Sequence, residues 1–424
     1  MKSKKRAFLH LEPLEDRWVP ATVRFISGTL FISNPAVTAG ASAVTVTQTA
    51  ANTFSVTDGG KANGTFAGVG NIFFTGSNGR DNFTLALGGT TYTGSLFANT
   101  GNGNDSISIT GTQMNGNAQL LTGFGNDSVS VAASVRGFLQ VSNTIGSASV
   151  TVTSATVGGD VTLNHIQSVT LTGATAFGGN VSVNDSTVSG SASITLGGTV
   201  TVNKNLSITA AGSDSVGITG TPTVNGNTQI NLGSGNDTVT VAGGTFGGSF
   251  NLTTGPGSDS VSVTAATVNG SANFNLGGGN DTFSTAAAVS VLGNFSLTEG
   301  AGNDSVTVDN SVAGNMSFNL GNGTDTVTVG NAPGGQLLWT SGNGNDSVTF
   351  GDATNVPGTW NVHMTFGTGN DTLTLAGNGT VATPNSLTGF IDMGGPPGGN
   401  SFDPTGSLAA GTWVVVSPFT LQNV

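Results

Sequence analysis

Short runs that alternate between apolar and polar residues recur along almost the whole chain. In "TVTV" at 238–241, Val239 and Val241 fall on one face of an extended strand, because successive side chains of a strand point to opposite faces. The run "SFNL" at 249–252 alternates in the same way. No helical pattern extends beyond a few residues after residue 24. The pattern therefore predicts short, half-buried β-strands.

A glycine-rich turn that ends in an aspartate precedes each first strand, as in "GSGND" at 233–237. The aspartates of these turns are Asp81, Asp105, Asp127, Asp214, Asp237, Asp259, Asp281, Asp304, Asp325, Asp346 and Asp371. Neighbouring turns are 21 to 25 residues apart, except for a gap of 87 between Asp127 and Asp214, which is close to four units. Glycine-led strands such as "GDVTLNH" at 159 continue through that gap. The repeat is therefore continuous, and only the aspartates are missing there.

Strands this short cannot each bury a core alone, but stacked repeats bury their apolar faces on one another. We therefore predict an all-β, single-stack parallel β-solenoid of about 22 residues per coil. A propeller repeats at ~40–50 residues, and the strands of a β-sandwich pair would not share identical turns. The period predicts a leader at 1–24, N-terminal capping strands at 25–75, the solenoid at 76–387 and a C-terminal cap at 388–424.

The charge of the chain is strongly negative after the first 24 residues. Four basic residues then remain against 19 acidic residues, all but Glu299 being aspartate, which gives a net charge of −15. Such a surface repels nucleic acid and anionic membranes and attracts cations. No apolar run approaches the ~20 residues of a membrane span. We therefore expect no nucleic-acid binding and no transmembrane segment.

In-register stacking would place the aspartates of successive turns in one column. Two like charges ~4.8 Å apart repel by about 0.9 kcal/mol in water and by about 3.5 kcal/mol at an effective dielectric of 20. Asparagine would make the same turn without this cost, so a bare column calls for a counter-ion. Calcium takes 6–8 hard oxygen ligands, both carboxylates and main-chain carbonyls. The pattern thus favours Ca²⁺ ligation by all eleven aspartates, in two blocks separated by the gap.

The segment Gly233-Ser234-Gly235-Asn236-Asp237-Thr238-Val239 resembles the hemolysin-type, or repeats-in-toxin, calcium-binding nonapeptide G-G-x-G-x-D-x-U-x from its second glycine onward. The resemblance implies calcium bound between the turns of adjacent coils. This chain departs from the family in lacking most first glycines and in having one motif per 22 residues, which implies a single metal column. The alternative reading of Gly-Asn-Asp is good turn chemistry alone, since Asn and Asp side chains cap their own backbone.

The first residues, "MKSKKRAFLHLEPLEDRWVPA", have a basic start, but Glu12, Glu15 and Asp16 interrupt any apolar signal region. The stretch resembles the LEPR-type leader of many planctomycete surface proteins, which implies export to the cell surface or outside. The chain has no cysteine, which fits a secreted protein that does not depend on disulfides. A disordered amphipathic tail is the alternative.

Enzymes on β-solenoids need a non-repeating cluster of catalytic groups, and none is visible here. His165 and His363 are isolated, and Trp339 and Trp360 fall at core positions. We therefore expect a non-catalytic, secreted or cell-surface, calcium-stabilised structural or adhesive solenoid. Its partners beyond calcium would be envelope polysaccharide, surface proteins or another copy of itself. The alternatives are an ice- or glycan-binding surface formed by outward Thr, Ser and Asn ladders, and a polysaccharide-active β-helix enzyme.

Overall fold

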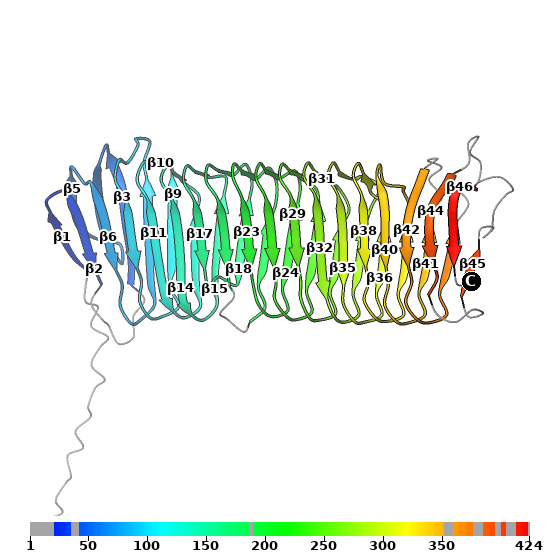
Figure 1. Ribbon diagram of the computed structural model, residues 1–424. Helices are drawn as coiled ribbons and strands as arrows, with labels where there is room; N and C mark the ends of the chain where they lie inside the picture. Colours follow the sequence, from blue (N-terminus) through cyan, green and yellow to red (C-terminus); the bar gives the residue numbers. More distant parts are fainter. Residues whose placement is uncertain are drawn as a thin grey trace, which may run out of the picture.

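The chain forms an elongated stack of β-coils, seen side-on in Figure 1. The computed structural model describes residues 21–34, 42–185, 190–351, 359–375, 385–394, 400–403 and 413–422. Every regular element in these ranges is a β-strand. About 13 turns of about 22 residues each make a parallel β-solenoid, which confirms the predicted fold class and period.

Each regular coil has three faces, and one of them is an 18-stranded sheet, here called sheet A. Its strands lie side by side in parallel from β8 onward, each paired with the strand about one coil later. These strands are β8 (Leu96–Asn99), β11 (Ala118–Phe124), β14 (Leu139–Ile145), β17 (Val161–Asn164), β20 (Val181–Asn184), β23 (Leu206–Thr209), β26 (Thr228–Asn231), β29 (Phe250–Thr253), β32 (Ala272–Gly277), β35 (Phe295–Glu299), β38 (Met316–Asn319), β40 (Gln336–Thr340), β42 (Thr359–Thr365), β44 (Asn385–Asp392) and β46 (Trp413–Gln422).

Sheet B is the second face and consists of the strands that follow the glycine-rich turns. Its parallel strands are β7 (Asp81–Leu87), β9 (Ser106–Gly111), β12 (Asp127–Val131), β15 (Ala148–Thr153), β18 (Ser168–Thr172), β21 (Ser193–Leu196), β24 (Ser215–Thr219), β27 (Thr238–Ala242), β30 (Ser260–Val263), β33 (Thr282–Thr285), β36 (Ser305–Val308), β39 (Thr326–Val329), β41 (Ser347–Phe350), β43 (Thr372–Leu375) and β45 (Ser401–Asp403).

The bend between sheets B and A is itself a third face, which the sequence pattern did not predict. It is a 10-stranded sheet, sheet C, of very short parallel strands. They are β10 (Gln113–Met114), β13 (Ser134–Val135), β16 (Thr156–Val157), β19 (Ala176–Phe177), β22 (Thr201–Val202), β25 (Thr223–Val224), β28 (Thr245–Phe246), β31 (Ala266–Val268), β34 (Val289–Val291) and β37 (Ser311–Val312). Val224 and Phe246 are buried. The recurring Thr-Val and Thr-Phe pairs therefore form strands that close the core.

The N-terminal end differs from the regular coils because its strands pair in antiparallel fashion. β1 (Thr22–Ile26) pairs with β2 (Thr29–Ser33), and β3 (Ser42–Ala50), β4 (Thr53–Asp58) and β5 (Lys61–Ala67) form a meander. β2 then pairs in parallel with β6 (Asn71–Thr75), which joins sheet A. At the other end, β44 and β46 continue sheet A beyond residue 388 in parallel register.

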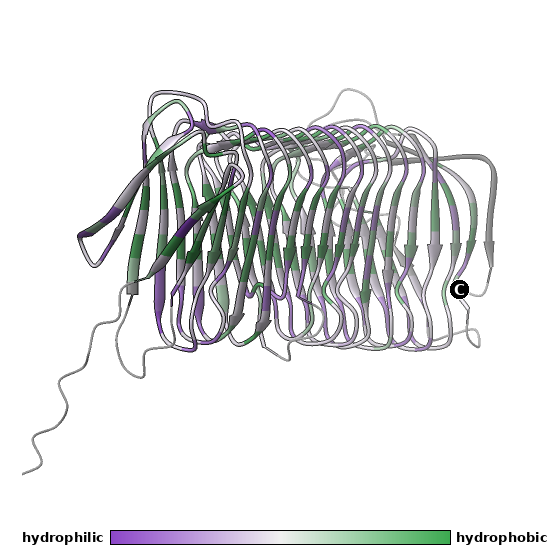
Figure 2. Ribbon diagram, turned by 90° about the vertical axis from the view of Figure 1, so that its left-hand side faces the viewer, coloured by the Kyte–Doolittle hydropathy of each residue, from purple (hydrophilic) through white to green (hydrophobic). Residues whose placement is uncertain are grey.

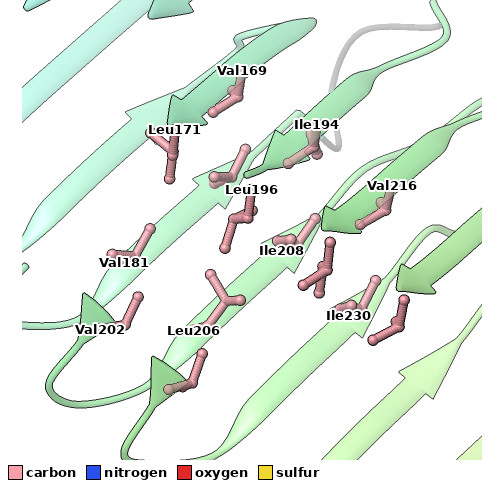
Figure 3. Close-up of a cluster of buried hydrophobic side chains, with 14 of the residues drawn as sticks. Val169, Leu171, Val181, Ile194, Leu196, Val202, Leu206, Ile208, Val216 and Ile230 are labelled. Carbon is pink, nitrogen blue, oxygen red and sulfur yellow. The ribbon is translucent and has the colours of Figure 1, made fainter. Parts of the chain in front are cut away.

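The core lies between the three sheets and consists of the apolar members of each alternating run. Figure 3 shows Leu171 and Leu196 of sheet B, Ile208 of sheet A and Val202 of sheet C in the shared interior. The predicted core residues Val239, Val241, Phe250 and Leu252 are at most 2% exposed, and so are Trp339 and Trp360. In Figure 2 the hydrophobic stretches lie along the strands, and hydrophilic stretches gather at the corners.

The outer face of sheet B carries two columns of hydroxyl side chains. Ser106, Ser128 and Ser149 stand in one column, which continues through Thr238 to Thr372. The second column contains Thr240 and Thr374, and is interrupted at Gly217. The strand period of two fixes this arrangement, because the apolar partners point inward.

Candidate functional site

The aspartates of the glycine-rich turns lie in one column, at the corner where the chain passes from sheet A to sheet B. These turns follow one edge of the stack, the lower edge in Figure 1. All eleven predicted residues are buried, with at most 3% of each side chain exposed. The parallel pairing of the following strands, such as Thr238 with Ser260, fixes this vertical alignment. The structure thus brings together every aspartate that the motif singled out, apart from the break at the gap.

Each aspartate of the column after Asp81 accepts through Oδ1 a hydrogen bond from the main chain of the preceding coil. The N–H of Asp237 donates to Oδ1 of Asp259 at 2.8 Å, and the N–H of Asp259 donates to Oδ1 of Asp281 at 2.8 Å. The same bond joins Asp81 to Asp105, Asp105 to Asp127, Asp214 to Asp237, Asp281 to Asp304, Asp304 to Asp325, Asp325 to Asp346 and Asp346 to Asp371. A buried N–H needs a partner, and at this corner the carboxylate supplies it.

The asparagine before the aspartate forms a second ladder of hydrogen bonds, on the exposed side of the turn. These bonds run in the opposite direction along the stack. Asn303 accepts a hydrogen bond at 2.8 Å from the N–H of Thr324 in the following coil. Asn236 and Asn345 accept in the same way from Ser258 and Asn370. The Asn and Asp side chains of the turn therefore have a structural role, but they bind the main chain of neighbouring coils rather than capping their own backbone as the turn-chemistry interpretation expects. The asparagine reaches forward and the aspartate backward.

The second oxygen of the carboxylate has no such role. Within the described residues, Oδ2 is buried and has no hydrogen-bond partner in ten of the eleven aspartates: Asp105, Asp127, Asp214, Asp237, Asp259, Asp281, Asp304, Asp325, Asp346 and Asp371. An unpaired buried acceptor is costly, and a charged one more so. The hydrogen bond between coils accounts for one oxygen of each of these ten carboxylates and leaves the other unexplained.

Burial makes nine of the column carboxyl groups hard to ionise. The pKa of Asp237 and Asp325 is raised to about 7, mainly by burial; a main-chain hydrogen bond lowers it and the neighbouring carboxylates raise it. Burial is also the main cause that raises the pKa of Asp105 and Asp281 to about 6. Burial also raises the pKa of Asp127, Asp214, Asp304, Asp346 and Asp371. A proton or a bound cation would remove this cost.

Gln167 and Asp185 continue the ladder across the gap where the motif is lost. The N–H of Ala148 donates to Oε1 of Gln167 at 2.6 Å, and Nε2 of Gln167 donates to Oδ1 of Asp185 at 3.1 Å. Ala192 then donates to Asp214 at 2.7 Å, which restarts the regular series. Asp185 is fully buried, and its Oδ2 also has no partner among the described residues. Asp160, the other acid of the gap, instead binds the N–H of Asn180 at the corner before sheet A.

Both ends of the column have amide side chains. At the N-terminal end, Nδ2 of Asn34 donates to Oδ1 of Asp81, and the N–H and hydroxyl of Ser77 satisfy Oδ2 of Asp81 at 2.6 and 3.1 Å. At the C-terminal end, Asn400 takes the place of an aspartate and accepts from the N–H of Asp371 at 2.8 Å. Its Nδ2 donates to the carbonyl oxygens of Met393 and Gly394 at 2.9 and 2.8 Å.

The turn glycines allow the coils to stack directly on one another. Gly125 has a φ of +137°, and a Cβ built on it would lie 1.5 Å from the carbonyl oxygen of Gly103 in the coil before. No side chain fits at that distance, and the positive φ also favours glycine. The glycines of the motif are therefore required by the stacking itself, whatever the aspartates bind.

A metal ion in this column would need main-chain ligands. The described part of the chain contains no group of three or more His, Cys, Asp or Glu side chains placed to hold a metal ion. His165 binds the carbonyl oxygen of Asn143 through Nδ1 at 2.9 Å, and His363 stacks on Phe390. The ligands that the column offers are the free carboxylate oxygens, and carbonyl oxygens of the turns would have to complete any metal site. Such an all-oxygen set suits calcium.

The sequence analysis did not identify Gln167, Asp185 and Asn400 as members of the column. Of these three residues, only Asp185 had a signal in the sequence, because it is an acidic residue inside the gap.

The part of the chain that the structure describes contains no helix with the length and hydrophobicity of a membrane span. No protein-family model, curated protein or solved structure is significantly similar to this chain.

Proposed function

We propose that the protein is a secreted or cell-surface structural or adhesive rod, non-catalytic, whose aspartate column binds Ca²⁺. The observation that carries the proposal is the row of buried Oδ2 atoms that lack a hydrogen-bond partner. The leader-like first residues support export. The period and the rod shape support a structural role, because nearly every coil repeats the same surface.

Asn400 supports a cation in the regular turns. Its Nδ2 takes the place of the free Oδ2 of an aspartate and finds two carbonyl acceptors, Met393 and Gly394. The pairing of Thr365 with Asp392 aligns these two residues with Phe366 and Gly367 of the preceding turn. By analogy with Asn400, we infer that Oδ2 of a regular aspartate lies near carbonyl oxygens of its own turn, which are acceptors like itself. A cation between them would satisfy both.

Calcium fits this arrangement better than the other common divalent ions. It accepts irregular sets of carboxylate and carbonyl oxygens, whereas Mg²⁺ demands near-ideal octahedral geometry and zinc prefers nitrogen and sulfur. The ligands would be the ten aspartates with a free Oδ2, each with carbonyl oxygens of its turn. Bound calcium supplies the positive charge that cancels the repulsion along the column.

Metal that binds only the folded chain stabilises it by mass action. The protein would therefore stay loosely folded where calcium is scarce and become rigid outside the cell. Far-UV circular dichroism and thermal melting of the full chain, in chelator and at millimolar calcium, test this directly. We expect a higher melting temperature with calcium, little change with magnesium, and several moles of calcium per chain in an elemental assay. An unchanged melting temperature and no bound calcium would contradict the proposal.

The hydroxyl columns of sheet B favour a second candidate, a surface that binds glycan or ice. Two in-register rows of Ser and Thr form an uncharged face along the rod. Serine and threonine alternate irregularly in these rows, so a regular methyl lattice is absent from the described strands. Thermal hysteresis in calcium-containing buffer and co-sedimentation with insoluble polysaccharide would identify this function. Neither effect is expected if the rod is only structural.

A further inference from the structure

Glu299 breaks the repeat at a position that the neighbouring turns fill with leucine. It ends β35, five residues before Asp304, where the two adjacent turns have Leu276 and Leu320. Both leucines are fully buried. Glu299 is also the single glutamate after the first 24 residues. A leucine would fill this space without any electrostatic cost, so packing does not explain the carboxylate.

The side chain of Glu299 is buried and unpaired. It is 3% exposed, and neither Oε1 nor Oε2 has a hydrogen-bond partner among the described residues. Removing a carboxylate from water without a partner is among the most costly events in a protein interior. A proton or a bound cation has to compensate the charge here.

The surroundings of Glu299 are acidic. Burial raises the pKa of Glu299 to about 9, with further contributions from Asp304, Asp281 and Asp325 in that order. The Oδ2 atoms of these three aspartates are themselves unpaired. The sequence has no lysine or arginine after Lys204, so no basic side chain of this half of the chain neutralises the cluster.

We propose that Glu299 and Asp304 together hold one divalent cation, completed by main-chain carbonyls of the turn, in a site that is tighter than the other sites of the column. Asp281 and Asp325, in the turns before and after, add negative charge around it. Affinity for calcium rises with the number of charged ligands, and Glu299 adds one to a turn that otherwise offers a single carboxylate. This inference rests on the proposed function, because it assigns one site within the same column.

Isothermal titration of the full, calcium-depleted chain with Ca²⁺ tests the inference. The wild type should show one binding event at least about tenfold tighter than the rest, followed by weaker events. Glu299→Leu should lose the tight event and keep the weaker ones. This variant is expected to fold, because Leu276 and Leu320 occupy the same position in neighbouring turns. Glu299→Gln, which keeps the shape without the charge, should lose the tight event as well.

The outcomes separate this inference from the proposed function. If the wild type binds no calcium, both fail. If the wild type binds calcium but both variants give its isotherm unchanged, the Glu299 site alone is wrong. Melting in chelator gives a second readout, in which Glu299→Leu should raise the melting temperature by removing an unpaired carboxylate. Calcium should then raise the melting temperature of this variant less than that of the wild type. An equal increase in both would also overturn the site.

Discussion

The main-chain N–H of Asp237 donates a 2.8 Å hydrogen bond to Oδ1 of Asp259, 22 residues later in the sequence and one coil further along the rod. Repeated from turn to turn, this contact uses one carboxylate oxygen and leaves the other buried and unpaired. The two oxygens of one side chain thus have different tasks. The first holds the turn together, and we propose that the second binds the cation.

Asp259→Asn separates these two tasks. The amide keeps an oxygen that accepts from Asp237, and its nitrogen can donate to turn carbonyls, as the nitrogen of Asn400 does. In chelator we expect a melting temperature equal to or above that of the wild type. In calcium the variant should gain less stability and bind less metal. If Asp259→Asn gains as much from calcium as the wild type, the aspartate is not a ligand.

Asp259→Ala is the companion variant, because it removes both oxygens. It leaves the N–H of Asp237 buried without its partner, which should cost about 1–3 kcal/mol of unfolding free energy. The loss should appear in chelator as well as in calcium. Denaturant unfolding under both conditions measures it. A neutral result in chelator would show that the ladder bond contributes little to stability.

The pH dependence of stability follows from the raised pKa values. Burial raises the pKa of Asp237 and Asp325 from 3.8 to about 7, so the folded chain holds these protons more tightly than the unfolded chain. Their contribution to stability is complete below about pH 4 and is lost as the pH rises through about 7. In chelator the melting temperature should therefore fall between pH 5 and pH 8. Calcium should reduce this slope, and a flat profile in chelator would contradict the assignment.

Gln167→Leu tests the bridge across the gap. The change removes the acceptor of the Ala148 N–H and the donor to Asp185, both in a buried place. We expect a loss of about 1–3 kcal/mol, since buried groups are left without partners. Gln140→Leu is the matched control, because Gln140 belongs to β14 and lies half-buried on its outer face. Equal stabilities of the two variants, measured by urea unfolding, would argue against the bridge.

Gly125→Ala should be poorly tolerated, because the new Cβ would meet the Gly103 carbonyl oxygen at 1.5 Å with φ at +137°. Forcing two coils apart should cost at least about 1–3 kcal/mol. Gly217→Ala is the control, since a Cβ there meets nothing within 4 Å. Gly217 interrupts a hydroxyl column, and Gly217→Thr should be neutral or stabilising because glycine weakens a strand interior. Thermal melts of the three variants rank them.

The sequence predicted the solenoid because both of its signals are local and periodic. Alternation in runs such as Thr238–Val241 fixes which side chains point inward, and the spacing of Asp237 and Asp259 fixes the coil length. The third face escaped prediction because a strand of two residues, such as Thr245–Phe246, is too short to show alternation. Its pairing exists only once the coils are stacked.

The details of the column were less predictable because they depend on contacts between coils. Like charges in register suggested carboxylates that share ions, but the pattern gave no sign that Oδ1 of Asp259 accepts from a main-chain N–H. Gln167 belongs to no sequence motif, because its role depends on a hydrogen bond from Ala148 in a neighbouring coil, 19 residues away. Asn400 follows a longer turn and escaped the spacing rule. Whether calcium occupies the column stays a prediction.

The opposed directions of the asparagine and aspartate ladders give the rod a polarity. In the regular turns, the column aspartate binds toward the N-terminal neighbour and the ladder asparagine toward the C-terminal one. A complete repeat could therefore be added or removed in the middle without giving any residue a new kind of neighbour. The number of coils can therefore vary without changing the contacts inside the stack. The amides of Asn34 and Asn400 lie at the two ends of the aspartate column.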